Sequence, residues 1–266
     1  MLEIIDLKKS FREPSGNQIS ILDVPIFSMK AAEQVVLRGE SGCGKTTLLH
    51  TISGLLDCDS GSIKLDGIEL TKYSEAARDR IRADKLGYVF QTFNLLPAFT
   101  ALENVKLGMT FARKTIRSER ATELLSRVGL KDRMHYLPSQ LSVGQQQRVA
   151  IIRALLQPFD LLLMDEPFTG VDATTQEVTF GLLDHLREKQ VTTIISTHDL
   201  NLAATRFDLV LLINHRLIAF GTPQQVFTKE NLASAFGNSL LVMENGMMLV
   251  DECCPPDEEH HHIEVK

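Results

Sequence analysis

The sequence is poor in the features that mark several protein classes. It has no tryptophan, only 6% aromatic residues, and no apolar run near the roughly 18 residues that a membrane-spanning helix needs. Four cysteines in 266 residues are too few for a disulfide scaffold, and the charges near the N-terminus do not suit a secretory signal peptide. These absences predict a cytosolic, reduced, globular protein that would need a membrane partner for any work at a membrane.

An excess of positive charge is also missing. The chain has 28 Lys and Arg against 34 Asp and Glu, a formal net charge of −6, whereas nucleic-acid-binding proteins carry a basic surface. Residues 251–266 hold six acids and one lysine, a charge of −5, together with Cys253, Cys254, His260 and the two histidines that follow it. This composition predicts a disordered acidic tail. A zinc site there is the less favoured alternative, because adjacent cysteines and adjacent histidines are poorly spaced for tetrahedral coordination.

Short apolar runs alternate with longer helical patterns, which predicts an α/β fold with a mostly parallel sheet covered by helices. The expected buried strands are Gln34–Leu37, Leu86–Phe90, Leu161–Met164, Thr192–Ser196 and Leu209–Ile213. The expected helices are Lys45–Ser53, Ser118–Val128, Gly144–Leu156 and Thr174–Glu188. Two-residue turns at Asp66-Gly67 and Asn245-Gly246 predict β-hairpins. We expect one domain over residues 1–250, with a helical insertion over about 92–158.

A glycine-rich motif follows the expected strand that ends at Leu37 and opens an expected helix. It reads Gly39-Glu40-Ser41-Gly42-Cys43-Gly44-Lys45-Thr46, followed by Thr47, and fits the phosphate-binding pattern G-x-x-x-x-G-K-[ST]. The glycines let backbone N–H groups surround a polyphosphate, and the helix N-terminus adds its positive dipole end. Lys45 can reach the β- and γ-phosphates, and the Thr46 hydroxyl is placed to bind Mg²⁺. The motif predicts a nucleoside triphosphate site, in which Cys43 occupies a variable position.

Two adjacent carboxylates, Asp165 and Glu166, end the leucine-rich run Leu161–Met164. In enzymes with a phosphate-binding loop (P-loop), the first acid secures Mg²⁺ and the second polarises the water that attacks the γ-phosphate. Exposed acids often end strands, so the pair is a weak signal alone and a strong one beside the P-loop. We predict Asp165 as a Mg²⁺ ligand and Glu166 as the general base.

The segment from Leu141 to Arg148 is the most specific in the chain. Ser142 is a good N-cap and Gly144 permits close backbone approach, so this helix start is a second candidate anion site. The plainer alternative is a capped helix with glutamines on a solvated face. The segment reads L-S-V-G-Q-Q-Q-R and resembles the signature sequence of ATP-binding cassette (ABC) ATPases, L-S-G-G-Q-x-Q-R, with Val143 in place of the first glycine.

Further motifs of that family follow the same order. Gln91 resembles the Q-loop glutamine, Asp172 the D-loop aspartate and His198 the switch histidine. The resemblance covers roughly residues 1–225. It implies a P-loop NTPase of the ABC cassette type, with a RecA-like core, an antiparallel β-subdomain and a helical subdomain.

The resemblance also implies roles for these residues. ABC ATPases form head-to-tail dimers in which two ATP molecules lie between the P-loop of one subunit and the signature of the other. Ser142, Gly144 and the adjacent Gln145 would therefore contact ATP held by the partner's P-loop, and Val143 would alter nucleotide affinity. His198 would hold the γ-phosphate and the attacking water, and Asp172 would be a further catalytic residue, as would Lys45 and Gln91.

Two further roles come from the resemblance. Gln91 would bind Mg²⁺ and report the nucleotide state to a membrane subunit. Phe11 matches the aromatic residue that stacks on adenine, although packing in the first strand is nearly as well supported. The implied cofactors are ATP and Mg²⁺.

The function implied by the resemblance is ATP hydrolysis that drives a separate transmembrane permease from the cytoplasmic face, with no nucleic-acid partner. The ATPase would act as a homodimer or as a heterodimer with a similar ATPase. Residues 86–105 resemble ATPases of the lipoprotein-releasing and macrolide-efflux type. Residues 216–232 and the His-rich tail look more like manganese- or zinc-importer ATPases, which is the alternative.

Two other classes are less favoured. A soluble ABC ATPase acting on DNA would separate its motifs by a long coiled coil, and a ribosomal one would carry two cassettes. A monomeric P-loop kinase has no reason to carry the signature or His198. We expect a transporter ATPase of the efflux type.

Overall fold

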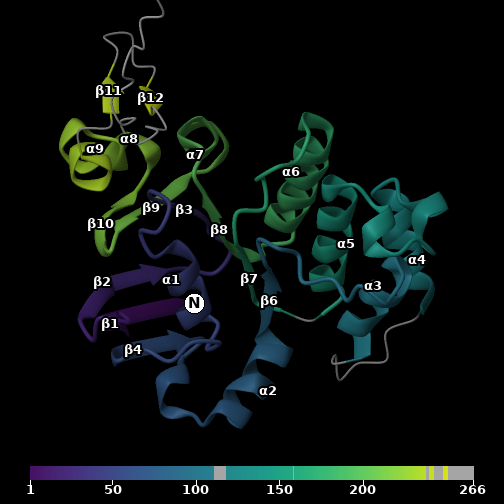
Figure 1. The fold of residues 1–266 in the computed structure, drawn as a ribbon, viewed down its shortest axis with the longest axis horizontal. Coiled ribbons are helices and arrows are strands. Elements are labelled where there is room, and N and C mark those ends of the chain that lie inside the picture. The colour runs from purple at the N-terminus through teal and green to yellow at the C-terminus, as the bar shows by residue number, and fades with distance from the viewer. Residues whose placement is uncertain (111–117, 158, 238–239, 243–247, 251–266) are drawn as a thin grey trace, which may run out of the picture.

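The computed structural model describes residues 1–110, 118–157, 159–237, 240–242 and 248–250. Within these ranges a ten-stranded sheet runs through the molecule, with helices packed around it (Figure 1). Among the described residues, none of the helices is long and apolar enough to cross a bilayer.

Five neighbouring strands form the parallel part of the sheet, in the order β9-β3-β8-β7-β6. Their bounds are β9 (Leu209–Asn214), β3 (Gln34–Arg38), β8 (Thr192–Thr197), β7 (Leu161–Met164) and β6 (Leu86–Val89). They are the five strands expected from the sequence, each ending within one residue of its expected bound. The central three are buried along their whole length, which is why their apolar residues stand next to one another, as in Val35–Leu37 and Leu161–Met164, rather than alternating with polar ones.

The other half of the sheet is mainly antiparallel and has the order β5-β4-β1-β2-β10. Its bounds are β5 (Ile68–Glu69), β4 (Ser60–Leu65), β1 (Leu2–Arg12), β2 (Gln18–Met29) and β10 (Arg216–Gly221). The expected turn at Asp66-Gly67 joins β4 to β5 and is confirmed. The second strand of this hairpin is shorter than expected, because the chain enters a 3-10 turn, Leu70–Lys72.

The four expected helices are present with ends within one residue of the predicted ones: α1 (Lys45–Ile52), α4 (Ser118–Arg127), α5 (Val143–Leu155) and α6 (Ala173–Glu188). Helix α3 (Ala101–Thr110) lies within the expected helical insertion, although the sequence does not predict its bounds. Four further helices are not expected from the sequence: α2 (Glu75–Lys85), α7 (Leu200–Arg206), α8 (Pro223–Val226) and α9 (Lys229–Phe236). Helix α2 buries none of its residues, so it lacks the apolar period by which a helix is recognised.

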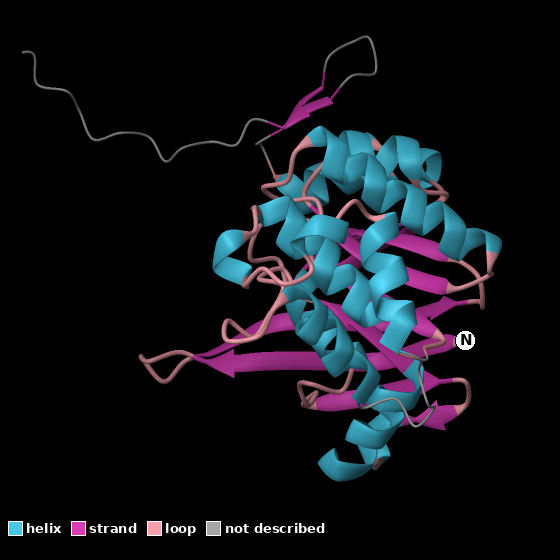
Figure 2. Cartoon of the chain, turned by 90° about the vertical axis from the view of Figure 1, so that its right-hand side faces the viewer, coloured by secondary structure: helices cyan, strands magenta, loops and turns pink. Residues whose placement is uncertain are grey.

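Between residues 92 and 157 the described residues form helices and turns, as expected for the insertion. Helices α3, α4 and α5 enclose a core of their own, which includes Val105, Leu125 and Ile152. A second core lies between α1 and the antiparallel strands, and a third joins α5, α6, α7 and α9 to the parallel strands. Figure 2 looks from the side of α4 and α5 and shows helices in front of the sheet.

The C-terminal hairpin is described only in its strands. β11 (Leu240–Val242) pairs antiparallel with β12 (Met248–Val250), with Leu240 opposite Val250. The predicted turn at Asn245-Gly246 lies outside the described residues, as does the tail 251–266 with its cysteines and histidines.

Candidate functional site

The P-loop connects the end of β3 to the start of α1. Gly42 has φ 78° with open space where a side chain would stand, and Gly44 has φ 103° as the N-cap of α1. A Cβ added at Gly39 would lie 2.4 Å from the carbonyl oxygen of Ile213. The loop is fixed from the side of β9 as well, because the His215 N–H donates to the Cys43 carbonyl over 3.0 Å. Glycine is thus required here both for backbone conformation and for close packing.

Lys45 is held inside this loop. Its ammonium donates hydrogen bonds to the carbonyl oxygens of Gly39 (3.0 Å) and Glu40 (2.9 Å) and lies 3.4 Å from a carboxylate oxygen of Glu166. The side chain is 7% exposed. A buried ammonium beside a glycine-lined backbone can attract and orient phosphate oxygens.

Asp165 lies at the carboxyl end of β7 and accepts two hydrogen bonds. One comes from the Thr46 hydroxyl (2.7 Å) and the other from the Ser196 hydroxyl (2.6 Å). The hydroxyl of Thr46 and the carboxylate of Asp165 therefore converge beside the P-loop. Hydroxyl and carboxylate oxygens are the hard donors that Mg²⁺ prefers, so these two residues fit the predicted cation.

Glu166 adopts φ 46°, a left-handed conformation that is uncommon outside glycine. Such strain costs about 1–3 kcal/mol and is characteristic of functional sites. Its N–H donates to Ser196 Oγ over 2.8 Å, and its carboxylate lies 2.8 Å from Nδ1 of His198 and accepts from the Thr169 hydroxyl (3.2 Å). His198, Thr169 and Lys45 thus orient the carboxylate from three sides. A carboxylate held in this way can accept a proton from water.

These groups surround one cavity of about 170 Å³. It is lined by Ser41, Gly42, Gly44, Lys45, Thr46, Thr47, Gln91 and Glu166. The structure therefore brings the predicted P-loop, base and Q-loop residues together, with Asp165 and His198 hydrogen-bonded to members of the same group.

The signature segment lies elsewhere in the chain. Figure 1 shows α5, which it opens, well separated from α1, and none of residues 141–148 lines the P-loop cavity. Ser142 is the N-cap of α5, as predicted, and forms a capping box with Gln145. A Cβ added at Gly144 would lie 2.4 Å from the Thr175 hydroxyl oxygen. The close approach predicted at Gly144 therefore occurs within this chain, between α5 and α6.

Asp172 and Phe11 also lie outside that cavity. Asp172 is the N-cap of α6 and accepts a hydrogen bond from the Thr175 N–H (2.8 Å), which lowers the pKa of its carboxyl group. Phe11 is 44% exposed on β1, with the Lys9 ammonium 5.4 Å from its ring centroid. An exposed ring can stack on a flat ligand, and the adenine role of Phe11 stays a prediction.

Cys43 is buried within the P-loop, and burial raises the pKa of its thiol. A protonated, enclosed thiol is a poor nucleophile, which agrees with a small residue at a variable position. Sequence reasoning missed Ser196, whose hydroxyl bridges Asp165 and Glu166. The available signal was a polar residue at the end of an expected buried strand, two residues before His198.

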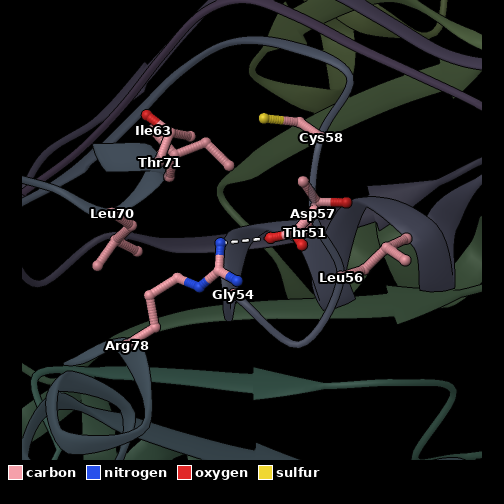
Figure 3. Close-up of a pocket in the computed structure, with 9 residues that line it drawn as sticks. All are labelled: Thr51, Gly54, Leu56, Asp57, Cys58, Ile63, Leu70, Thr71 and Arg78. Carbon is pink, nitrogen blue, oxygen red and sulfur yellow. Dashed lines mark ion pairs between the residues drawn. The ribbon is translucent and has the colours of Figure 1, made fainter. Parts of the chain in front are cut away.

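A second cavity, of about 340 Å³, is lined by nine residues shown in Figure 3. Among them are Thr51 and Gly54 at the C-terminal end of α1, whereas the P-loop lies at its N-terminal end. Arg78 and Asp57 form an ion pair at this cavity, and burial raises the pKa of the nearby Cys58 thiol. This cavity shares no lining residue with the P-loop cavity. Within the described part of the chain, no group of three or more His, Cys, Asp or Glu side chains is arranged to hold a metal.

Comparisons with known proteins agree with the geometry. The sequence profile of the family described as "ABC transporter" matches residues 22–169. The chain is 41% identical over 220 residues to the uncharacterized ABC transporter ATP-binding protein YbbA of Escherichia coli (strain K12), covering 82% of this chain and 96% of the relative. It is 40% identical over 205 residues to the similarly described YvrO of Bacillus subtilis (strain 168), covering 76% and 89%.

Solved structures give the same result for the fold. One is described as the dimeric structure of a post-hydrolysis state of the ATP-binding cassette MJ0796 bound to ADP and Pi. It matches with a TM-score of 0.78 and 32% identity, covering 84% of this chain and 99% of the other. A second dimeric structure of MJ0796, described as a bacterial ABC transporter cassette, matches with the same values.

Proposed function

This chain belongs to the ABC transporter family, and we propose that it binds ATP at the P-loop and hydrolyses it with Glu166 as the general base. The chain is an ATP-binding subunit with ATPase activity, as the family and the post-hydrolysis neighbour indicate. The observation that carries the assignment of residues is the cluster around Glu166, in which Lys45, Ser196 and His198 all contact one strained acid.

In the proposed reaction, the P-loop amides and Lys45 hold the phosphates, and Thr46, Asp165 and Gln91 would hold Mg²⁺. When bound, Mg²⁺ neutralises charge on the phosphate oxygens. A water attacks the γ-phosphorus and transfers a proton to the Glu166 carboxylate. The bond to the β–γ bridging oxygen breaks, which leaves ADP and inorganic phosphate.

His198 supports this step from the exposed side of the site. Its Nδ1 lies 2.8 Å from the carboxylate of Glu166, while its side chain is 51% exposed. It can therefore orient the base and also face a phosphate or water that enters the cavity. We assign His198 both roles.

A dimer is proposed because the signature and the P-loop lie apart in one chain, while the solved neighbours are described as dimeric. In a head-to-tail arrangement, Ser142, Gly144 and Gln145 would reach ATP held by the partner. Asp172 would lie near the same interface. Val143 is 49% exposed at the start of α5, so its side chain would face that ATP directly and alter its affinity.

A groove of about 510 Å³ between α2, α3 and β6 is the proposed docking site for a separate transmembrane permease. Its apolar lining includes Leu55, Leu86, Tyr88, Phe90, Leu96 and Leu107. Asp79, Arg82 and Arg153 supply charged groups. An apolar groove with a few charges suits an amphipathic cytoplasmic helix, and it would place the ATPase at the cytoplasmic face of the membrane.

The residues that resemble the efflux-type ATPases, 86–105, contribute β6 and the start of α3 to the region of this groove. Their resemblance therefore falls where the membrane partner is proposed to bind, which supports the lipoprotein-release or macrolide-efflux type. The importer-like segment 216–232 forms β10, α8 and the start of α9 and does not line the groove. A metal-ion importer remains the second candidate.

The experiment is to replace Glu166 by Gln. Since a general base contributes about 10²- to 10⁴-fold, phosphate release by Glu166→Gln should fall by at least about a hundredfold while ATP still binds. Size-exclusion chromatography with ATP should show a shift from monomer to dimer. Lys45→Ala should instead lose ATP affinity, because it removes a contact made before the reaction. Undiminished turnover by Glu166→Gln would contradict the role of Glu166 as the base.

A further inference from the structure

Arg38 is the last residue of β3 and directly precedes the P-loop. Its side chain is buried, with 3% of the residue exposed. Its Nη1 donates a hydrogen bond to the Gly39 carbonyl over 2.6 Å, and its guanidinium carbon lies 4.7 Å from the ring centroid of Phe236. Phe236 is the last residue of α9 and is itself buried. A buried cation therefore joins the helix α9 to the first residue of the P-loop.

Burial opposes the positive charge of Arg38, and nearby carboxylates support it. Burial lowers the pKa of Arg38 to about 10, against the opposing effect of nearby carboxylates, of which Glu166 is the strongest. Nε of Arg38 has no hydrogen-bond partner within the described residues, and an unsatisfied buried donor destabilises the folded state. An apolar side chain of similar volume often serves stability as well as a buried cation or better. Folding alone therefore does not account for an arginine at this position.

The hydrogen bond to the Gly39 carbonyl is a reason for an arginine at position 38. This oxygen accepts hydrogen bonds from two cations, Arg38 Nη1 and Lys45 Nζ. If a bound phosphate took the Lys45 ammonium away from this oxygen, Arg38 would remain as the donor that fixes this peptide. Because the peptide unit is planar, holding the Gly39 carbonyl also holds the direction of the following N–H at the start of the P-loop.

Arginine is suited to this position and lysine is not. A planar guanidinium stacks on an aromatic face while it donates hydrogen bonds in its own plane, whereas an ammonium is a point charge on a flexible stem. The ring of Phe236, whose centroid lies 4.7 Å from the guanidinium carbon, therefore restrains the position of the Arg38 side chain. In that position Nη1 reaches the Gly39 carbonyl.

We propose that Arg38 is a positioning residue for ATP binding, that Phe236 holds it in place, and that the helix α9 thereby sets the conformation of the P-loop. The proposal rests on the proposed assignment of the P-loop as the ATP site. Arg38 acts through the Gly39 peptide, and the helix that supports it lies almost 200 positions further along the chain.

The test measures the affinity of the full-length protein for a non-hydrolysable ATP analogue with Mg²⁺, by titration calorimetry, together with Tm. Since residues that act through one contact show coupling, Arg38→Met should raise Kd about tenfold and Phe236→Leu about threefold. The double variant should bind no more weakly than Arg38→Met alone. Arg38→Lys should also bind weakly, because it keeps the charge and loses the planar stack.

Phe207→Leu is the matched control, since Phe207 is buried in the same core as Phe236. It should lower Tm and leave Kd unchanged. Equal effects of Phe236→Leu and Phe207→Leu on Kd, additive effects in the double variant, or wild-type binding by Arg38→Met would each overturn the proposal. If Arg38→Met does not fold, the comparison of Kd between Phe236→Leu and Phe207→Leu tests the proposal. Wild-type binding by Lys45→Ala would instead contradict the P-loop as the ATP site.

Discussion

At the residue scale, Ser196 links the two acids of the site. Its hydroxyl donates to Asp165 and accepts from the N–H of Glu166, and the residue is fully buried on β8. The hydroxyl therefore holds both the proposed cation ligand and the strained backbone of the proposed base. Its loss would leave a buried N–H without a partner at the point where the geometry matters most.

Ser196→Ala should lower both stability and catalysis. An unsatisfied buried donor costs about 1–3 kcal/mol, and a small displacement of Glu166 should reduce kcat about tenfold or more. Unfolding in denaturant and steady-state phosphate release measure the two effects. Thr193→Val is the matched control on the same strand, because the Thr193 hydroxyl is buried without a partner in the described part of the chain. Equal losses in both variants would show that Ser196 has no special role.

At the element scale, the first turns of α5 and α6 are closely packed against each other. A Cβ at Gly144 would lie 2.4 Å from the hydroxyl oxygen of Thr175 and 3.1 Å from its Cβ. Thr175 is itself buried and follows the Asp172 cap of α6. The start of the signature helix and the start of the next helix are therefore seated directly against each other.

Gly144→Ala should lower the free energy of unfolding. Overpacking costs about 1–3 kcal/mol, which exceeds the gain of at most about 1 kcal/mol in helix propensity. Thr175→Ala should restore part of the loss in the double variant. On the same helix α6, Gly181 has open space where a Cβ would stand, so Gly181→Ala should be neutral or stabilising. Denaturant titration distinguishes these outcomes, and a stabilised Gly144→Ala variant would contradict the packing argument.

At the scale of the whole molecule, three apolar side chains at or near the groove face solvent. Leu55 and Leu96 line the groove and are each 44% exposed, and Phe99 is 38% exposed, whereas Phe93 lies in the core at 9%. The proposed docking site thus includes Leu96, which lines the groove, with Phe99 near it in the chain. Phe93 instead belongs to the core, and its carbonyl accepts a hydrogen bond from Arg153.

Leu96→Asp should abolish co-purification with the cognate permease, because a carboxylate in an apolar groove is costly to desolvate. ATP hydrolysis by the isolated subunit should persist. Ile26→Asp provides the control, since Ile26 is 70% exposed on β2 and does not line the groove. Retention of the complex by Leu96→Asp would contradict the docking surface, and a bound permease with a large extracytoplasmic domain would favour the efflux type.

The sequence predicts what is local and periodic. The P-loop, the acids after β7 and the parallel strands each depend on a short run of residues, so they could be predicted from pattern alone. Contacts that depend on how neighbouring strands are aligned could not be predicted in this way. The parallel pairing of β3 with β8 places Leu37 opposite Ser196 and Arg38 opposite Thr197, which brings distant residues to one edge of the sheet. Likewise, the polar surface of α2 left no apolar period to detect.

Because Lys45 contacts Glu166, binding of ATP would replace one anion at the Lys45 ammonium, the Glu166 carboxylate, by another, a phosphate. The ammonium that should hold a phosphate already lies 3.4 Å from the carboxylate of the proposed base, so an incoming nucleotide competes with an internal anion for the same cation. Part of the attraction between Lys45 and phosphate is therefore used to separate this pair. We expect anions that interact weakly with Lys45 to be unable to displace the carboxylate and therefore to bind poorly. A phosphate that replaces the carboxylate at Lys45 would free Glu166 to accept a proton.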